Sequence, residues 1–271
     1  MQHTITHQTT FEFDEVQGAV VQRFHLTPVN GTGQVVREWQ LDVDGGSIEL
    51  ETTDFHGNHI HLCRLDTQAK SITITCRGSV VVEDLNGIAG PHEGHIPLPM
   101  FCQPTRLSRM GPRLRDLFHK IDDWRYDEMV SDPALMHHLS ACVHDSIRYE
   151  IGITDVTTTA EQAMERGAGV CQDHAHAFIS IARSIGFPAR YASGYLMMDD
   201  TPLQQASHAW AEVYLSGLGW VGFDISNGIS PDHRYIKLAT GFDYADVSPV
   251  SGVRFGDGGE QVSTSIVFEQ Q

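Results

Sequence analysis

The sequence predicts an α+β protein in which a β-sandwich-like N-terminal domain precedes a second domain of helices and antiparallel strands. Segments with β-branched residues and alternating polarity fill the first part of the chain, and helical patterns begin only after it. Between the two parts "GHIPLPMFCQPT", residues 94–105, brings three prolines close together. We therefore predict a β-rich domain over residues 1–100 and a second domain over residues 101–271.

The expected N-terminal strands are separated by short polar turns. They are "RFHLTPVN", "VVREWQLDVDG", "HIHLCRLD" and "SITITCRGSVVVED". "DGG" at 44–46 and "HGN" at 56–58 are typical of hairpin connections, because glycine and asparagine tolerate the positive φ angles of tight turns. Strands joined in this way favour a sandwich or a small barrel.

The first helical pattern is "SDPALMHHLSACVHDSIRYE", residues 131–150. Asp132 is expected as its N-cap and Pro133 as its first helical residue. An apolar residue recurs at every fourth position and should form a buried stripe, made of Leu135, Leu139, Val143 and Ile147.

Two further helices are expected before the chain returns to strands. Thr158 and Glu161 have capping-box spacing, and Gly167 should end the short helix that they begin. A longer helix should run from about residue 170 to residue 185 and stop at "GFP". The strands expected after it are "ARYASGYLMM", "HAWAEVYL", "WVGFDIS" and "VSTSIVFE".

Composition and charge exclude several classes of function. The chain has 18 Lys and Arg against 35 Asp and Glu, a net charge of -17 that repels phosphate backbones and anionic membranes. Neither nucleic acid nor a membrane is therefore an expected partner. No stretch approaches the roughly 20 apolar residues of a membrane span. The start, "MQHTITHQTTFEFDE", lacks the basic and apolar parts of a secretory signal, so a cytoplasmic location is expected.

Five cysteines, at positions 63, 76, 102, 142 and 171, make an odd count without a CxxC pair. A disulfide framework or a zinc ribbon is therefore not expected, and most of the cysteines should be buried and reduced.

Cys171 differs from the other cysteines in its setting. "GVCQDHAHAF", residues 169–178, reads as the start of a helix with a thiol in its first turn. The positive end of a helix dipole stabilises a thiolate, and a nearby histidine does so further. Gly167 and Gly169 leave the approach open, and we expect their N–H groups and that of Cys171 to face a developing oxyanion. The alternative is a core cysteine without chemistry.

Two partners for this thiol are found in "SHAWAEVYLSGLGWVGFDIS", residues 207–226. The segment predicts a hairpin with His208 near the start of one strand and Asp224 at the end of the next. With an odd number of loop residues, both side chains project from one face as diagonal neighbours. A thiol, a base and an orienting acid are the parts of a nucleophilic site. Trp210 and Trp220 are expected to flank the pair, and the alternative is an ordinary strand histidine.

These segments together resemble a known family. "GAGVCQDHAHAFISIARSIGFPARYASGYL" and "SHAWAEVYLSGLGWVGFDISNG" are similar to the bacterial branch of the transglutaminase-like superfamily, whose members are described as candidate cysteine proteases. "RFHLTPVNGTGQVVREWQLDVDG" resembles the β-rich domain that precedes this core. The resemblance covers most of the chain. It implies a papain-like core with Cys171 as nucleophile, His208 as base and Asp224 as the orienting acid.

Two positions depart from the family pattern. In the closing segment "FDYADVSPVSGV", Phe242 stands where the family usually has arginine, which removes any ion pair made from that position. Ser226 stands where threonine is more common, and it keeps the hydroxyl.

The resemblance implies a cysteine hydrolase that cleaves a peptide or amide bond through a thioester, without a cofactor or metal. An amine in place of water would make the protein a transglutaminase instead, and we favour hydrolysis because of the family. The alternatives are that transglutaminase, a non-catalytic binding module that keeps the fold, and a metal-dependent hydrolase. The sequence leaves the oligomeric state open.

Other polar residues have expected supporting roles. Asp173 and His176 belong to the family signature, and we expect them to support the helix rather than to take part in chemistry. A buried Arg190 would need a carboxylate, for which Asp173 is the candidate. The segment 197–207 is expected at the rim of the cleft, made acidic by Asp199 and Asp200.

A histidine cluster in the N-terminal domain raises the question of a metal. Besides His56, the residues His59, His61 and Cys63 would share one face of a strand, as zinc ligands can. Histidines are common in this chain, which holds 16, so no metal site is predicted here.

Overall fold

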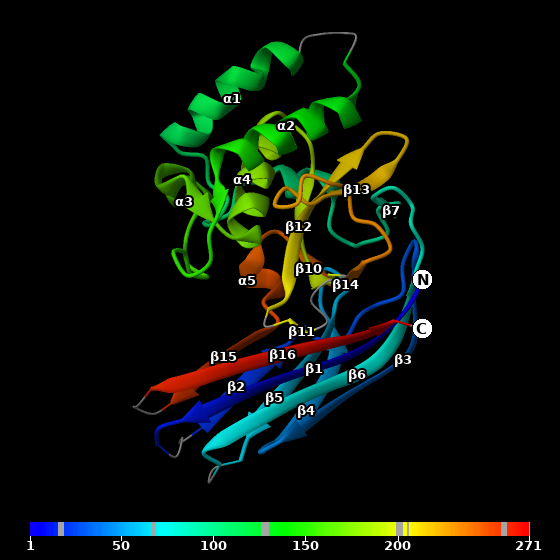
Figure 1. The fold of residues 1–271 in the computed structure, drawn as a ribbon, viewed down its shortest axis with the longest axis vertical. Helices are drawn as coiled ribbons and strands as arrows, with labels where there is room; N and C mark the ends of the chain where they lie inside the picture. The colour runs from blue at the N-terminus through cyan, green and yellow to red at the C-terminus, as the bar shows by residue number, and fades with distance from the viewer. Residues whose placement is uncertain are drawn as a thin grey trace.

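The computed structural model describes residues 1–15, 19–66, 69–125, 130–198, 203–204, 206–255 and 259–270. Long strands form one half of the molecule, and helices around a second group of strands form the other (Figure 1). The prediction of an α+β fold with antiparallel sheets is therefore confirmed.

Two antiparallel sheets form the N-terminal half and share one hydrophobic core. The first sheet has the order β11 (Leu203–Gln204), β16 (Glu260–Gln270), β1 (Gln2–Phe13), β6 (Ser71–Val82) and β3 (Gln34–Asp44). The second has the order β15 (Val250–Phe255), β2 (Ala19–Phe24), β5 (His59–Leu65) and β4 (Gly46–Thr53). Ile5, Phe24 and Ile72 are fully enclosed in the core, which is what the alternating pattern of a half-buried strand requires.

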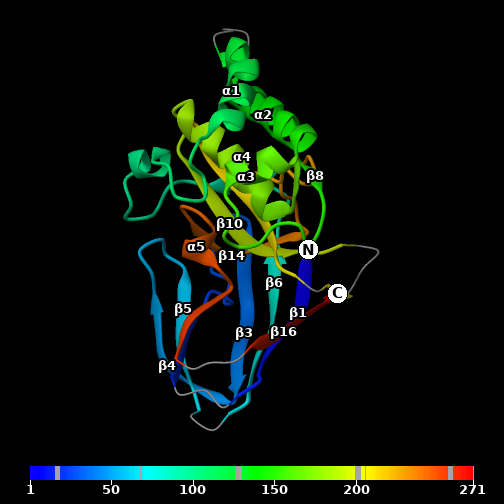
Figure 2. The ribbon, with the colours of Figure 1, turned by 90° about the vertical axis from the view of Figure 1, so that its left-hand side faces the viewer.

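Strand pairing does not follow the predicted division at residue 100. β16, from the end of the chain, pairs with β1, so that His3 lies opposite Gln270 and the two termini are neighbours (Figures 1 and 2). β15 likewise pairs with β2. In the other direction β7 (Ile88–Gly90) leaves the N-terminal part and pairs with β13 (Gly219–Phe223) of the second half.

The second half is built around a sheet with the order β14 (Tyr235–Gly241), β10 (Ala189–Leu196), β12 (His208–Leu215), β13 and β7. The helices around it are η1 (Leu98–Cys102), α1 (Pro112–Arg125), α2 (Asp132–Ser146), α3 (Ala160–Arg166), α4 (Cys171–Ser184) and α5 (Tyr244–Val247). α4 is the central helix and packs on β12 and β10, with every residue from 172 to 183 buried. Two short parallel strands, β8 (Arg148–Tyr149) and β9 (Ala168–Gly169), lead into it.

Helix starts are shifted by one residue from two of the predictions. The N-cap of α2 is Ser131 rather than Asp132. Asp132 and Pro133 both lie in the first turn of the helix. The capping box of α3 uses Thr159 and Gln162 rather than the predicted pair. The stripe of apolar residues expected in α2 is buried as predicted.

Side-chain amides join the two halves along the outer edge of β14. Gln34 accepts a hydrogen bond from the backbone N–H of Lys237 at 2.8 Å and donates one to its carbonyl at 2.9 Å. Asn58 does the same at Thr240, at 2.8 and 2.9 Å. These amides satisfy backbone groups of an edge strand that would otherwise lack partners. No helix among the described residues is long and apolar enough to cross a membrane.

Candidate active site

The start of α4 presents Cys171 as its first residue, partly exposed. Asp173 fixes this end of the helix, because its carboxylate accepts hydrogen bonds from Val170 N–H at 2.8 Å and from the Thr154 hydroxyl at 2.7 Å. Gly169 makes this approach possible, since a Cβ there would lie 2.6 Å from the carboxylate of Asp173. These contacts agree with the supporting role expected for Asp173.

The expectation for the oxyanion donors is wrong at one position. Gly167 is the C-cap of α3 with a φ of 66°, and its N–H donates to the carbonyl of Ala163 at 2.9 Å. That N–H is therefore engaged in ending a helix and is not free for a substrate. The N–H of Cys171 lies in the first turn of α4, where backbone donors have no partner within the helix.

The predicted hairpin brings His208 and Asp224 together. β12 and β13 are joined by residues 216–218, an odd number, and Ala211 pairs with Phe223. Asp224 follows directly, so that it is the diagonal neighbour of His208, with the His208 Nε2 atom 2.6 Å from Asp224 Oδ2. Asp224 is fully buried, and 14% of the His208 side chain is exposed. A histidine with one side on a buried carboxylate and another open to a thiol has the geometry of a general base.

Sequence reasoning did not identify two further partners of Asp224. The Tyr235 hydroxyl donates to Oδ2 of Asp224 at 2.7 Å, and the Asn227 amide donates to the same oxygen at 2.6 Å. Asn227 lies in the family-like segment "SHAWAEVYLSGLGWVGFDISNG", three residues after Asp224. Its place in that segment could have identified it as a partner of Asp224. Tyr235 lies in β14 without any local motif and is placed only by the pairing of β14 with β10.

Electrostatics link the three predicted residues. Burial disfavours the imidazolium, but hydrogen bonding with Asp224 and Cys171 outweighs it and raises the pKa of His208 to about 10. Burial likewise opposes ionisation of Asp224, yet hydrogen bonds from His208, Tyr235 and Asn227 lower its pKa to about 2. The arrangement therefore stabilises a charged His208 between a carboxylate and a thiol. Such a site can activate a nucleophile and protonate a leaving group.

Two expectations about neighbours need correction. Trp210 flanks the site, with its ring 6.4 Å from that of His208, but Trp220 packs instead under Arg190 and beside Phe101. Arg190 pairs with Glu212 at 2.6 Å and not with Asp173. The reason is register: Arg190 and Glu212 are directly opposite in β10 and β12.

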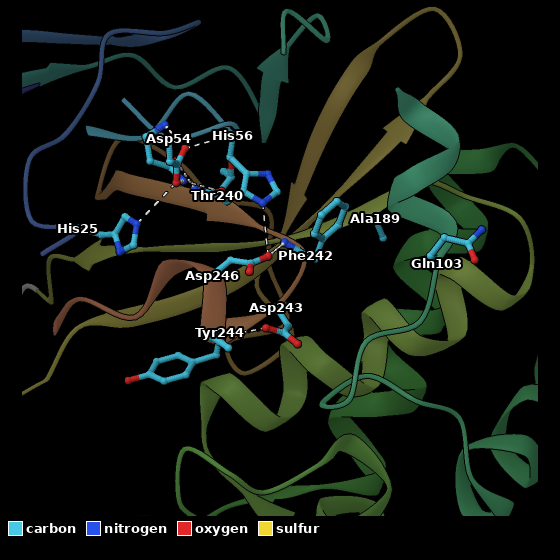
Figure 3. Close-up of polar contacts among 12 residues, drawn as sticks. His25, Asp54, His56, Gln103, Ala189, Thr240, Phe242, Asp243, Tyr244 and Asp246 are labelled. Carbon is cyan, nitrogen blue, oxygen red and sulfur yellow. Dashed lines mark hydrogen bonds and ion pairs between the residues drawn. The ribbon is translucent and has the colours of Figure 1, made fainter. Parts of the chain in front are cut away.

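Behind α4, buried polar side chains form hydrogen bonds with backbone groups rather than ion pairs. Burial lowers the pKa of His176 to about 3, and its Nε2 accepts a hydrogen bond from Tyr244 N–H at 3.2 Å. Arg183 donates to the carbonyl oxygens of Gln103, Ala189 and Phe242. Figure 3 shows those three residues. Phe242 thus takes part through its backbone, and its ring packs against that of His56 at 4.9 Å.

The histidines of β5 lie beside a carboxylate in the structure. His59 and His61 each lie 3.6 Å from the carboxylate of Glu51, and Cys63 is buried. In the described ranges, no group of three or more His, Cys, Asp or Glu side chains is arranged to hold a metal ion. Asp199 and Asp200, expected at the rim, lie outside the described residues.

Two protein-family models match parts of this chain. Residues 129–225, which include Cys171, His208 and Asp224, match the model of the transglutaminase-like superfamily. Residues 3–81 match the model of the bacterial transglutaminase-like N-terminal region. The two matches make this chain similar to bacterial transglutaminase-like proteins in both its core and its N-terminal region. The family resemblance predicted from the sequence is confirmed.

Two mycobacterial relatives are similar to this chain over most of their length. An uncharacterized protein of Mycobacterium tuberculosis is 26% identical over 278 residues, covering 93% of this chain and 87% of the relative. Another from Mycobacterium leprae is 25% identical, covering 94% and 93%. Among solved structures, a Cytophaga hutchinsonii protein described as a "Putative Cysteine Protease" has a TM-score of 0.74 at 21% identity, covering 99% of this chain and 98% of its own. That likeness shows the same fold.

Proposed function

We propose that this protein is a cysteine amidase or peptidase that acts through a thioester, with Cys171 as nucleophile, His208 as acid and base, and Asp224 as the orienting acid. The observation that carries the proposal is the buried Asp224 carboxylate 2.6 Å from His208, a histidine whose other partner is Cys171. The family, and the description of the Cytophaga protein, support the same class of reaction.

The proposed reaction has two halves. The Cys171 thiolate attacks the amide carbonyl carbon, the C–N bond breaks, and the His208 imidazolium gives its proton to the leaving amine. The Cys171 N–H, at the start of α4, is the proposed oxyanion donor. Water then attacks the thioester while His208 takes its proton, and the C–S bond breaks. The acid leaves, and the Cys171 thiolate and the His208 imidazolium are restored. Peptides or other amides are the proposed substrates, and no cofactor enters these steps.

The acyl-enzyme provides the direct test. A panel of activated peptide amides and esters would be mixed with the protein, and intact mass would be measured within seconds. We expect an added acyl mass that maps to Cys171 and then decays, and no added mass in Cys171→Ala. An adduct on another residue, or none with any donor, would contradict the proposal; the latter together with tight peptide binding would favour the binding module.

Cellular location is a separate proposal. The odd number of cysteines without paired spacing supports a reducing compartment, and we propose the cytoplasm. Fractionation of cells that express the protein would test this, and recovery outside the cytoplasmic fraction would contradict it.

A further inference from the structure

A second pocket lies on the face of the catalytic sheet that α4 does not cover. Tyr191 and Ala211 pack in the core with α4, so Arg190 and Glu212, their neighbours along β10 and β12, face the other way. The pocket has about 980 Å³ of empty volume, part of it open to solvent. It lies between this sheet and the loops of the N-terminal half that carry Asn30 and His56.

Two cations line this pocket and share a single carboxylate. Arg190 lies 2.6 Å and Lys237 2.9 Å from the two oxygens of Glu212. Only 15% of the Arg190 side chain and 22% of the Lys237 side chain are exposed, and 2% of Glu212. The guanidinium also lies 4.1 Å above the ring of Trp220, which fixes its plane. Within the described ranges, no other carboxylate forms an ion pair with either cation.

The trio therefore carries one net positive charge, from two cations and one anion. Burial opposes the charge on Glu212, but Arg190 and Lys237 outweigh it and lower the pKa of Glu212 to about 2, so this carboxylate is ionised at neutral pH. Burying a net charge is costly unless a counter-ion is near. In a chain of net charge -17, a mostly buried group with a surplus positive charge facing a pocket differs from the overall acidic charge.

The remaining donors point to one class of ligand. Arg190 uses Nε and one terminal nitrogen on Glu212, which leaves its other terminal nitrogen. Lys237 uses one N–H on Glu212 and has two more. Phe55, Phe101 and Pro91 add apolar walls. Glu93 also lines the pocket, but it is exposed and forms no ion pair with the cations among the described residues.

We propose that this pocket binds a small monocarboxylate with an apolar or aromatic body. One negative charge matches the single surplus positive charge, and the carboxylate receives hydrogen bonds from Arg190 and Lys237 while the body packs on Phe55 and Phe101. The site is separate from the proposed catalytic residues, since none of Cys171, His208 and Asp224 lines it.

Benzoate is the probe for this proposal, titrated by calorimetry and by ligand-observed NMR. We expect a dissociation constant of about 1 mM or lower, as small ligands in built sites reach. Benzamide, which has the same shape without the charge, should bind at least about tenfold more weakly. This comparison uses the wild-type protein and needs no variant. Equal binding of both probes, no binding of benzoate, or a preference for inorganic phosphate would overturn the proposal.

Substitutions in and outside the pocket test whether benzoate binds at the proposed site. Lys237→Met keeps the Arg190–Glu212 pair and removes the surplus charge, so benzoate affinity should fall at least about tenfold. Lys70→Met is the matched control, because Lys70 is exposed and outside the pocket, and it should bind as wild type does. Phe55→Ala should weaken benzoate more than acetate. Cys171→Ala should bind benzoate normally, and this result does not depend on turnover. Unchanged binding in Lys237→Met, or lost binding in Cys171→Ala, would place the probe elsewhere and overturn the proposal.

Discussion

Tyr235 donates its hydroxyl hydrogen to the same oxygen of Asp224 that faces His208, at 2.7 Å against 2.6 Å. The carboxylate is thus held from β14 as well as from its own hairpin. A buried carboxylate with several donors stays ionised and keeps its orientation, which in turn fixes the histidine ring. The position of His208 therefore depends on a strand that carries none of the three proposed catalytic residues.

Replacing Tyr235 with phenylalanine tests this dependence. We expect Tyr235→Phe to slow turnover by about fivefold, the equivalent of about 1 kcal/mol for one lost hydrogen bond. Tyr195→Phe is the matched control, because the Tyr195 hydroxyl is also buried but bonds to His7 in the N-terminal sheet. Both variants should lose similar stability in urea denaturation, and only Tyr235→Phe should lose turnover. Equal turnover in the two would show that the Tyr235 contact is merely structural.

Selective alkylation should distinguish Cys171 from the other four cysteines. Burial raises the pKa of Cys63 to about 11 and that of Cys76 to about 12, and it also raises the pKa of Cys102 and Cys142. These thiols are therefore protonated at neutral pH, whereas Cys171 faces His208. Iodoacetamide should modify Cys171 first, as read by peptide mass spectrometry. His208→Gln should slow this reaction, and equal rates for all five thiols in the folded protein would rule out an activated Cys171.

Asp224→Asn should reduce turnover at least about tenfold with the fold intact. An amide keeps the shape of the side chain but cannot stabilise an imidazolium, and in a serine triad the same change costs about 10⁴. A smaller loss is expected here because a thiolate can already form an ion pair with the histidine. Asp243→Asn is the control, since Asp243 is a buried carboxylate that caps α5. Wild-type turnover in a folded Asp224→Asn variant would remove Asp224 from the mechanism.

Much of the site could be predicted from the sequence because its parts are local. The hairpin register follows from a three-residue loop, which places His208 and Asp224 as diagonal neighbours. The helix start at Cys171 follows from the glycines before it and the apolar run after it. The partner of Arg190 could not be predicted in this way. It is set by the register between β10 and β12, which no local sequence pattern indicates.

The N-terminal half was harder for a physical reason. β1 was not among the predicted strands, because His3, His7 and Thr9 occupy its buried positions and obscure the alternation. Burial lowers the pKa of His7 to about 4, so it is buried neutral, with its ring nitrogens bonded to Tyr195 and Thr9. β15 and β16 pair with strands of the N-terminal sheets, so residues more than two hundred positions apart become neighbours. No local sequence pattern predicts such a pairing.

The contribution of His208 to stability should fall as pH rises. Its pKa is raised from 6.5 to about 10 in the folded protein, so the folded state binds its proton more tightly than the unfolded state does. This contribution is fully present below pH 6.5 and is lost as pH rises towards about 10. Urea denaturation of wild type and His208→Gln should show a difference in unfolding free energy that shrinks across this window. A difference that grows with pH would contradict the raised pKa.

The last prediction separates hydrolysis from transamidation. Both routes share the thioester, so they differ in whether water or an amine resolves it. Cys171 is partly exposed and 14% of the His208 side chain is open, so water reaches the atoms that would carry the acyl group. With a reactive amide substrate we therefore expect the carboxylic acid to dominate even when a primary amine is present at millimolar concentration. Product analysis by mass spectrometry would measure both products, with Cys171→Ala as the blank. A predominant amine adduct with little acid would instead make the protein a transglutaminase. In that case the bound amine would keep water away from the thioester, although the thiol itself is partly exposed.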